Sequence, residues 1–150
     1  MNVKLNKKKS FINHCIISRQ LSRSKLQNLN LAYNRMQNIC RPDDHWHGLS
    51  ESLQELNLAN NKIVKIPKGL STNFRALVSL NIDNNEIKQI PPELALSTTL
   101  KALRVWGNPQ RLIRPSVLEK GTEAVLAALG RRLPESLQEA VQSAALSRLG

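Results

Sequence analysis

One short segment of the chain holds the side chains that metal chemistry would need. Between Cys40 and Gly48 lie a thiol, two adjacent carboxylates and the imidazoles of His45 and His47, all of which are ligand types for zinc or another transition metal. The spacing argues against a site, because paired cysteines and a helical histidine pair four residues apart are both absent. We therefore expect a loop, with His45 and His47 as the candidate metal ligands of lowest rank. No cofactor is expected.

Catalytic residues are harder still to find. The remaining histidine, His14, is not predicted to face a nucleophile, and no glycine-rich phosphate loop precedes a helix. Asp43 and Asp44 are neighbours in a loop, which sets no defined separation for acid and base catalysis. The sequence therefore predicts a protein that is not an enzyme.

Positive charge is the third candidate for chemistry. The chain has 22 Lys and Arg against 11 Asp and Glu, a formal net charge of +11, and residues 1–41 contain no acid at all. Such a segment can bind the phosphates of nucleic acid or an anionic membrane by releasing counterions. Aromatic side chains for base stacking are limited to Phe11 and Tyr33 there, and no nucleic-acid motif is present. Polyanion binding through residues 1–41 is the alternative function, and a solvated tail is the simpler interpretation.

The elements that must position these residues follow from a repeat. The pattern LxxLxLxxN begins at Leu26, Leu53, Leu77 and Leu100, with starts 27, 24 and 23 residues apart, which lies in the range of leucine-rich repeats. Each repeat predicts a short strand whose leucines alternate into the core, and parallel strands need return segments on the far side. The predicted inward residues are Leu29, Leu31, Leu56, Leu58, Leu80, Ile82, Leu103 and Val105. We expect an α/β fold: a short right-handed horseshoe solenoid with parallel strands on its concave face.

An asparagine closes each of these motifs. Asn34, Asn61, Asn85 and Asn108 occur where the chain leaves the strand, and a side-chain amide there can bond turn backbone groups that would otherwise be buried without partners. We expect a structural asparagine ladder.

The residues that flank the inward leucines are available to bind a partner. No packing demand selects them, so the concave face is the predicted site for a protein partner. Aromatic and arginine side chains most often carry interface energy; for Trp106 the alternative is that it seals the last repeat against a cap. The predicted contact residues are Trp106, Arg104, Tyr33, Asp83, Asn30, Asn57, Asn81 and Glu55.

The two ends depart from the repeat pattern. Residues 1–25 read as a degenerate repeat or cap preceded by a basic tail, with Ile12, Cys15 and Ile17 imitating LxxLxL. The repeats cover residues 26–112. Residues 113–134 predict a helical cap, in which Ser116 and Glu119 form a capping box and Thr122 caps a second helix.

Residues 135–150 predict an amphipathic helix. Leu137, Val141, Ala144, Ala145 and Leu149 lie on one face of it. Two alternatives stay open here: the helix packs back on the cap, or it docks on a partner.

A family resemblance rests on these motifs. The run Gly107-Asn108-Pro109, followed by Ile113-Arg114 and Lys120-Gly121-Thr122, resembles the carboxyl-terminal end of leucine-rich repeat-containing protein 40 and its relatives. Ile66-Pro67 and Ile90-Pro91 are similar to the same class of repeat, shared with Ras-pathway scaffolds. Those relatives carry many more repeats, so this chain would be a short member or a fragment. The resemblance implies an intracellular interaction protein without catalytic activity.

Together these observations predict a non-catalytic protein-protein interaction scaffold whose partner is a protein. No run approaches the roughly 18 apolar residues of a membrane span, and the first residues lack a signal-peptide pattern. The expected location is the cytoplasm, with the nucleus as the second choice.

Overall fold

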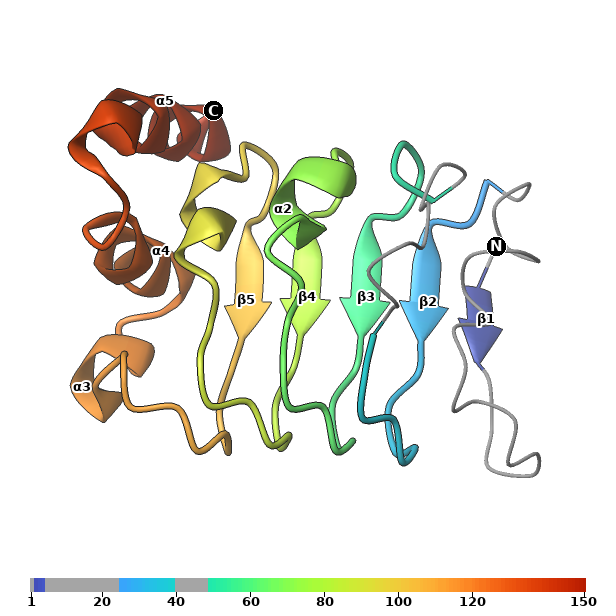
Figure 1. The fold of residues 1–150 in the computed structure, drawn as a ribbon. Coiled ribbons are helices and arrows are strands. Elements are labelled where there is room, and N and C mark those ends of the chain that lie inside the picture. Colours follow the sequence, from blue (N-terminus) through green and yellow to red (C-terminus); the bar gives the residue numbers. More distant parts are fainter. Residues whose placement is uncertain (1, 5–24, 40–48) are drawn as a thin grey trace.

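Five short parallel strands form one sheet in the order of the chain (Figure 1). The computed structural model describes residues 2–4, 25–39 and 49–150. The strands are β1 (Asn2–Lys4), β2 (Asn28–Asn30), β3 (Glu55–Asn57), β4 (Ser79–Asn81) and β5 (Ala102–Arg104). The middle residues of β2 to β5 are all leucines, and they pair in register from strand to strand. The repeat period in the sequence thus becomes the register of the sheet.

The strand beside β2 comes from the first residues of the chain. Val3 of β1 is the register partner of Leu29, and the alternation Val3-Lys4-Leu5 matches Leu29-Asn30-Leu31, 26 positions later. The predicted degenerate repeat rests instead on Ile12, Cys15 and Ile17, which lie outside the described residues. The signal was present as two apolar residues that flank a polar one.

The predicted inward residues form the core. Both apolar positions of each strand region from β2 to β5 are buried, from Leu29 and Leu31 to Leu103 and Val105. This part of the sequence prediction is confirmed, because side chains alternate across a strand and only one face of this sheet is covered by the chain itself.

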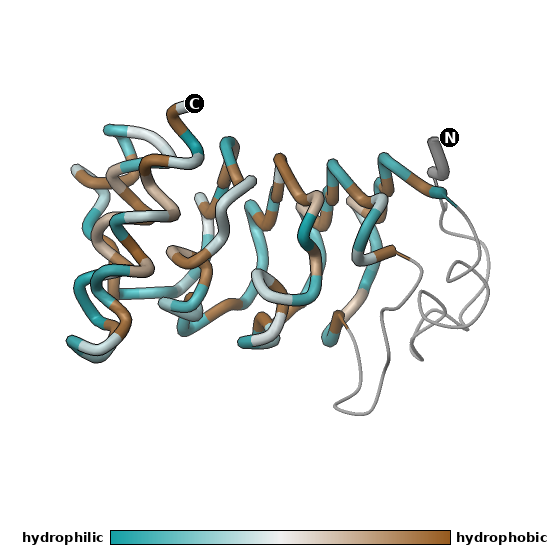
Figure 2. The backbone as a smooth tube through the Cα atoms, turned by 90° about the horizontal axis from the view of Figure 1, so that it is seen from above, coloured by the Kyte–Doolittle hydropathy of each residue, from teal (hydrophilic) through white to brown (hydrophobic). Residues whose placement is uncertain are grey.

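The return segments carry the other half of the core. They include α2 (Leu70–Asn73) and the 3-10 helix η1 (Pro92–Leu96). Ile66, Leu70, Phe74 and Leu94 are buried beneath them. Figure 2, seen along the strands, shows the strands in one row and the return segments in a second row. The core lies between these two rows.

Helices cover the end of the stack beyond β5. They are α3 (Pro115–Leu118), α4 (Thr122–Gly130), the 3-10 helix η2 (Glu135–Leu137) and α5 (Gln138–Leu149). Val125, Leu126 and Leu129 of α4 are buried in the same core as the repeats. No helix in the described ranges has both the length and the apolar character to cross a membrane.

The predicted caps of these helices are wrong. Helix α3 begins at Pro115 without a side-chain cap, and the residue before α4 is Gly121, with a φ of 89°. The hydroxyl of Thr122 instead accepts a hydrogen bond from the backbone N–H of Leu103 at 3.0 Å. Because β5 is the last strand, this N–H has no further strand to bond, and Thr122 satisfies the free edge of the sheet.

Helix α5 packs back on the cap, which decides between the two alternatives. Ala144 is buried, but Leu149 is 75% exposed, so its predicted place on the packing face is wrong. Arg148 is buried in its stead: it donates to the carbonyl of Ser97 at 2.6 Å and binds both carboxylate oxygens of Glu123 at 2.8 and 3.1 Å. A buried arginine is favoured here because carbonyls beyond the end of η1 need donors.

Candidate functional site

The outward side chains of β2 to β5 and of the turns that follow them form one surface, which we call the strand face. The sheet is parallel and in register, so equivalent positions of successive repeats lie side by side along it. Its members are Asn28, Asn30, Ala32 and Tyr33; Glu55, Asn57, Ala59 and Asn60; Ser79, Asn81, Asp83 and Asn84; and Ala102, Arg104, Trp106 and Gly107.

The asparagines at the strand ends shape the turns behind them. The side-chain oxygens of Asn30, Asn57 and Asn81 each accept a hydrogen bond from the backbone N–H two residues later, at 3.0, 3.1 and 3.0 Å. Within the described ranges, the amide NH₂ groups of Asn57 and Asn81 make no hydrogen bond. These predicted contact residues therefore have their oxygens committed to the turn and retain donors on an open face.

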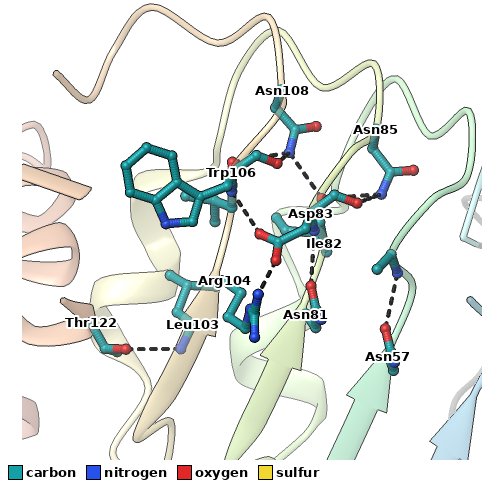
Figure 3. Close-up of polar contacts among 12 residues, drawn as sticks. Asn57, Asn81, Ile82, Asp83, Asn85, Leu103, Arg104, Trp106, Asn108 and Thr122 are labelled. Atoms are coloured by element: carbon teal, nitrogen blue, oxygen red, sulfur yellow. Dashed lines mark hydrogen bonds and ion pairs between the residues drawn. The ribbon is translucent and has the colours of Figure 1, made fainter. Parts of the chain in front are cut away.

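In the fourth repeat, a different residue accepts the hydrogen bond from the backbone N–H of the turn. Arg104 stands where the other repeats have asparagine, so the N–H of Trp106 bonds Asp83 of the neighbouring repeat, at 2.7 Å to Oδ1. The second oxygen of Asp83 accepts from Nε of Arg104 at 2.8 Å (Figure 3). Asp83 is only 5% exposed, whereas the side chain of Arg104 is 67% exposed. The buried carboxylate thus holds an exposed arginine and the backbone of an exposed tryptophan.

Two aromatic side chains mark the ends of the described strand face. Tyr33 is 66% exposed after β2 and Trp106 is 44% exposed after β5, three strand spacings away, or about 14 Å. Tyr33 has a φ of 59°, in the left-handed region that Asn60, Asn84 and Gly107 occupy at the equivalent positions. A bulky aromatic residue is uncommon in this conformation. Tyr33 therefore combines an exposed side chain with a strained backbone.

Glu55 adds an exposed carboxylate to β3. It lies in the same column as Ser79 and Ala102, its register partners along β4 and β5. The strand face is otherwise made of small and neutral polar side chains.

The second set of asparagines lies behind the turns and is saturated with hydrogen bonds. The oxygen of Asn61 accepts from the N–H of Met36 at 3.1 Å, and its NH₂ group donates to the carbonyls of Leu31 and Leu58, both at 2.9 Å. Asn85 and Asn108 bridge the next pairs of repeats in the same way. Asn34 is half-buried and bonds two carbonyls of its own repeat. Asn61, Asn85 and Asn108 therefore join successive repeats and are not free for a partner.

Two groups of predicted residues lie outside the described part of the chain. His45 and His47 are among them, as are most of the basic residues of 1–41. Within residues 2–4, 25–39 and 49–150, no three His, Cys, Asp or Glu side chains gather closely enough to hold a metal ion.

The hydrogen bonds of Asp83 are not among the sequence predictions. Asp83 is predicted to contact a partner, and in the structure its two carboxylate oxygens accept hydrogen bonds from Arg104 and Trp106. The signal was available: Asp83 breaks an alanine column in the repeat directly before the one where Arg104 breaks the asparagine column.

One comparison with known proteins bears on this surface. Residues 51–109 match the family model described as Leucine rich repeat, a stretch that contains β3, β4 and β5. With the parallel sheet and the C-terminal helices, the match fits an α/β repeat fold. Leucine-rich repeats commonly mediate protein-protein interaction and are in general non-catalytic.

Proposed function

We propose that the leucine-rich repeats of this chain form a non-catalytic module that binds a protein partner on the strand face. The observation that carries the proposal is the Arg104–Asp83–Trp106 cluster, because it presents two residue types that dominate interface energies in a geometry held by a buried carboxylate. Tyr33 supplies a third such residue at the other end of the face.

The geometry favours a partner that crosses several strands. An arginine that is already held by Asp83 loses less side-chain freedom on binding, which improves affinity without a new contact. Between the two aromatic residues, the free amide NH₂ groups of Asn57 and Asn81 can donate to backbone carbonyls of an extended segment or a convex surface. We assign Trp106, Arg104 and Tyr33 to direct contact and Asp83 to positioning.

Finer assignments belong to the same proposal. We infer that the repeats are part of a short right-handed horseshoe whose concave side is the strand face. The motifs from Gly107 to Thr122 support a relation to the end of leucine-rich repeat-containing protein 40. Cys15 and Cys40 lie 25 residues apart, which is neither a disulfide framework nor a paired metal motif, and this supports a reducing compartment such as the cytoplasm or nucleus.

Affinity capture from a cell lysate tests the strand face. We expect a set of proteins captured by the wild-type chain to be lost with Trp106→Ala and with Arg104→Glu. Leu146→Ala is the matched control, because Leu146 is 72% exposed on α5 and its loss also removes an exposed apolar side chain. Thermal unfolding of each variant checks that the fold is intact.

A captured set that is the same for all three variants would remove the strand face from the proposal. Salt provides a second discrimination. Partner binding on the strand face should persist at roughly 0.5 M salt, whereas polyanion binding through residues 1–41, the alternative function, should be lost there.

A further inference from the structure

A second surface lies directly after the asparagine ladder, at the ends to which the strand arrows point (Figure 1). Successive turns stack there through backbone hydrogen bonds: the N–H of Lys62 donates to the carbonyl of Met36, and that of Glu86 to the carbonyl of Ile63, both at 2.9 Å. Residues 35–38, 62–65 and 86–89 therefore lie side by side. The N–H of Ile87 donates to the side-chain oxygen of Asn108 at 3.2 Å, so residues 109–114 continue this row at its end. We call their exposed side chains the basic edge.

Charge is strongly segregated on the basic edge. It carries six exposed cations and one carboxylate, Glu86, for a net charge of +5. The cations are Arg35, Lys62, Lys65, Lys88, Arg111 and Arg114. Residues 42–150 as a whole are close to neutral, so this concentration cannot be read from the summed charge.

Four cations outside the basic edge form ion pairs within the described ranges. Lys68 pairs with Glu93, Arg75 with Glu51, Arg104 with Asp83 and Arg148 with Glu123. No cation of the basic edge forms an ion pair with any residue in the described ranges. The stacked turns thus hold like charges next to one another without neutralising them, which raises the local potential and attracts a polyanion.

The side chains between the cations indicate which polyanion fits. The basic edge contains no Phe, Tyr or Trp, so it offers no platform for the stacking of nucleic-acid bases. Exposed Gln37, Asn38 and Gln89 can bond peptide groups, and Val64 adds a small apolar contact at 46% exposure. We propose that the basic edge binds an acidic polypeptide segment, on a surface separate from the strand face.

A titration with labelled polyglutamate tests this proposal on the full chain. The variant Lys62→Glu, Lys65→Glu, Lys88→Glu should bind roughly tenfold more weakly or worse. The matched control Lys25→Glu, Lys101→Glu, Arg131→Glu changes the net charge equally at exposed cations outside the basic edge, and its affinity should stay within about twofold of wild type. The milder Lys62→Gln, Lys65→Gln, Lys88→Gln set should give an intermediate loss, which keeps the test valid if the reversed variant unfolds.

Three results would overturn the proposal. Equal losses for the edge and control variants would show that net charge alone drives binding. Loss of binding on neutralising Lys7, Lys8 and Lys9 to glutamine, with the edge variant unaffected, would assign it to the amino-terminal segment. Tighter binding of an oligodeoxythymidylate with the same number of negative charges would make the ligand a nucleic acid.

The proposals for the strand face and for the basic edge can be tested independently. Trp106→Ala should leave polyglutamate affinity unchanged while it abolishes capture on the strand face, so each proposal can be rejected without the other.

Discussion

Asparagine has two different roles in the repeats that begin at Leu53 and Leu77, and its burial decides which. Asn57, at a strand end, bonds the backbone two residues later and keeps its NH₂ group on an open face. Asn61, four residues on, is buried and bonds backbone groups of two repeats. The same side chain therefore shapes a binding surface at one position and joins repeats at the other.

Asn61→Ala should lower the free energy of unfolding by roughly 1–3 kcal/mol, because it leaves a buried backbone N–H and buried carbonyls without partners. Urea denaturation measures the loss. Asn34→Ala should cost less, since Asn34 is only half-buried and bonds carbonyls of its own repeat alone. Equal losses for the two variants would argue against a stabilising role for the hydrogen bonds that Asn61 makes between repeats.

Tyr33→Asn should raise the free energy of unfolding by up to about 1 kcal/mol. Asparagine tolerates the left-handed backbone that tyrosine occupies only with strain, and Asn60 and Asn84 already occupy it in the next two repeats. The same variant should bind the strand-face partner more weakly. Thermal unfolding and affinity capture on one preparation measure the gain in stability and the loss of binding. A destabilised variant would mean that the tyrosine ring contributes packing.

At the scale of elements, each strand and its turn form a unit that tolerates substitution when its neighbour compensates. The turn after β5 lacks the asparagine acceptor, and Asp83 from the turn after β4 replaces it. At the outer edge of β5, Thr122 of α4 does the same for Leu103. Backbone groups at the end of a stack need acceptors from outside the repeat pattern.

Asp83→Ala should cost roughly 1–2 kcal/mol of stability, chiefly through the unsatisfied N–H of Trp106, since the pair with the solvent-exposed Arg104 is screened by water and contributes little. Adding Arg104→Asn to Asp83→Ala should restore most of that loss, because the amide oxygen then accepts from Trp106 as in the other repeats. Denaturation of both single variants and the double variant measures the coupling. A strictly additive double variant would contradict the compensation.

At the scale of the whole molecule, one continuous core runs through the repeats into the cap. The buried residues from Leu26 to Leu133 belong to a single cluster, so each repeat is stabilised by its neighbours rather than by itself. The charge on the surface is distributed unevenly: the strand face is nearly neutral, and the basic edge has a net charge of +5.

Leu56→Ala should therefore destabilise the whole stack. Leu56 is 2% exposed, and a buried leucine truncated in a core that cannot collapse costs about 2–5 kcal/mol. We expect one unfolding transition at a lower denaturant concentration. Val64→Ala, which removes half-exposed apolar surface, should stay within about 0.5 kcal/mol of wild type. Two separate transitions in the Leu56→Ala variant would show that the repeats are not coupled through this core.

Much of this molecule was predictable from local pattern. The spacing of leucines determines which residues of β2 to β5 are buried, because alternation along a strand is set by backbone geometry. The position of Asn61 or Asn85 at the strand exit likewise predicts a polar group that bonds the turn. Both inferences need only the distance along the chain.

Contacts between distant segments were decided by the tertiary structure alone. Thr122 bonds β5 instead of capping a helix, Arg148 rather than Leu149 is buried, and Asp83 holds Arg104. The basic edge also appears only when turns from four repeats are stacked. In each case the free energy depends on which groups lie within a few ångströms in space, and separation along the chain does not specify that.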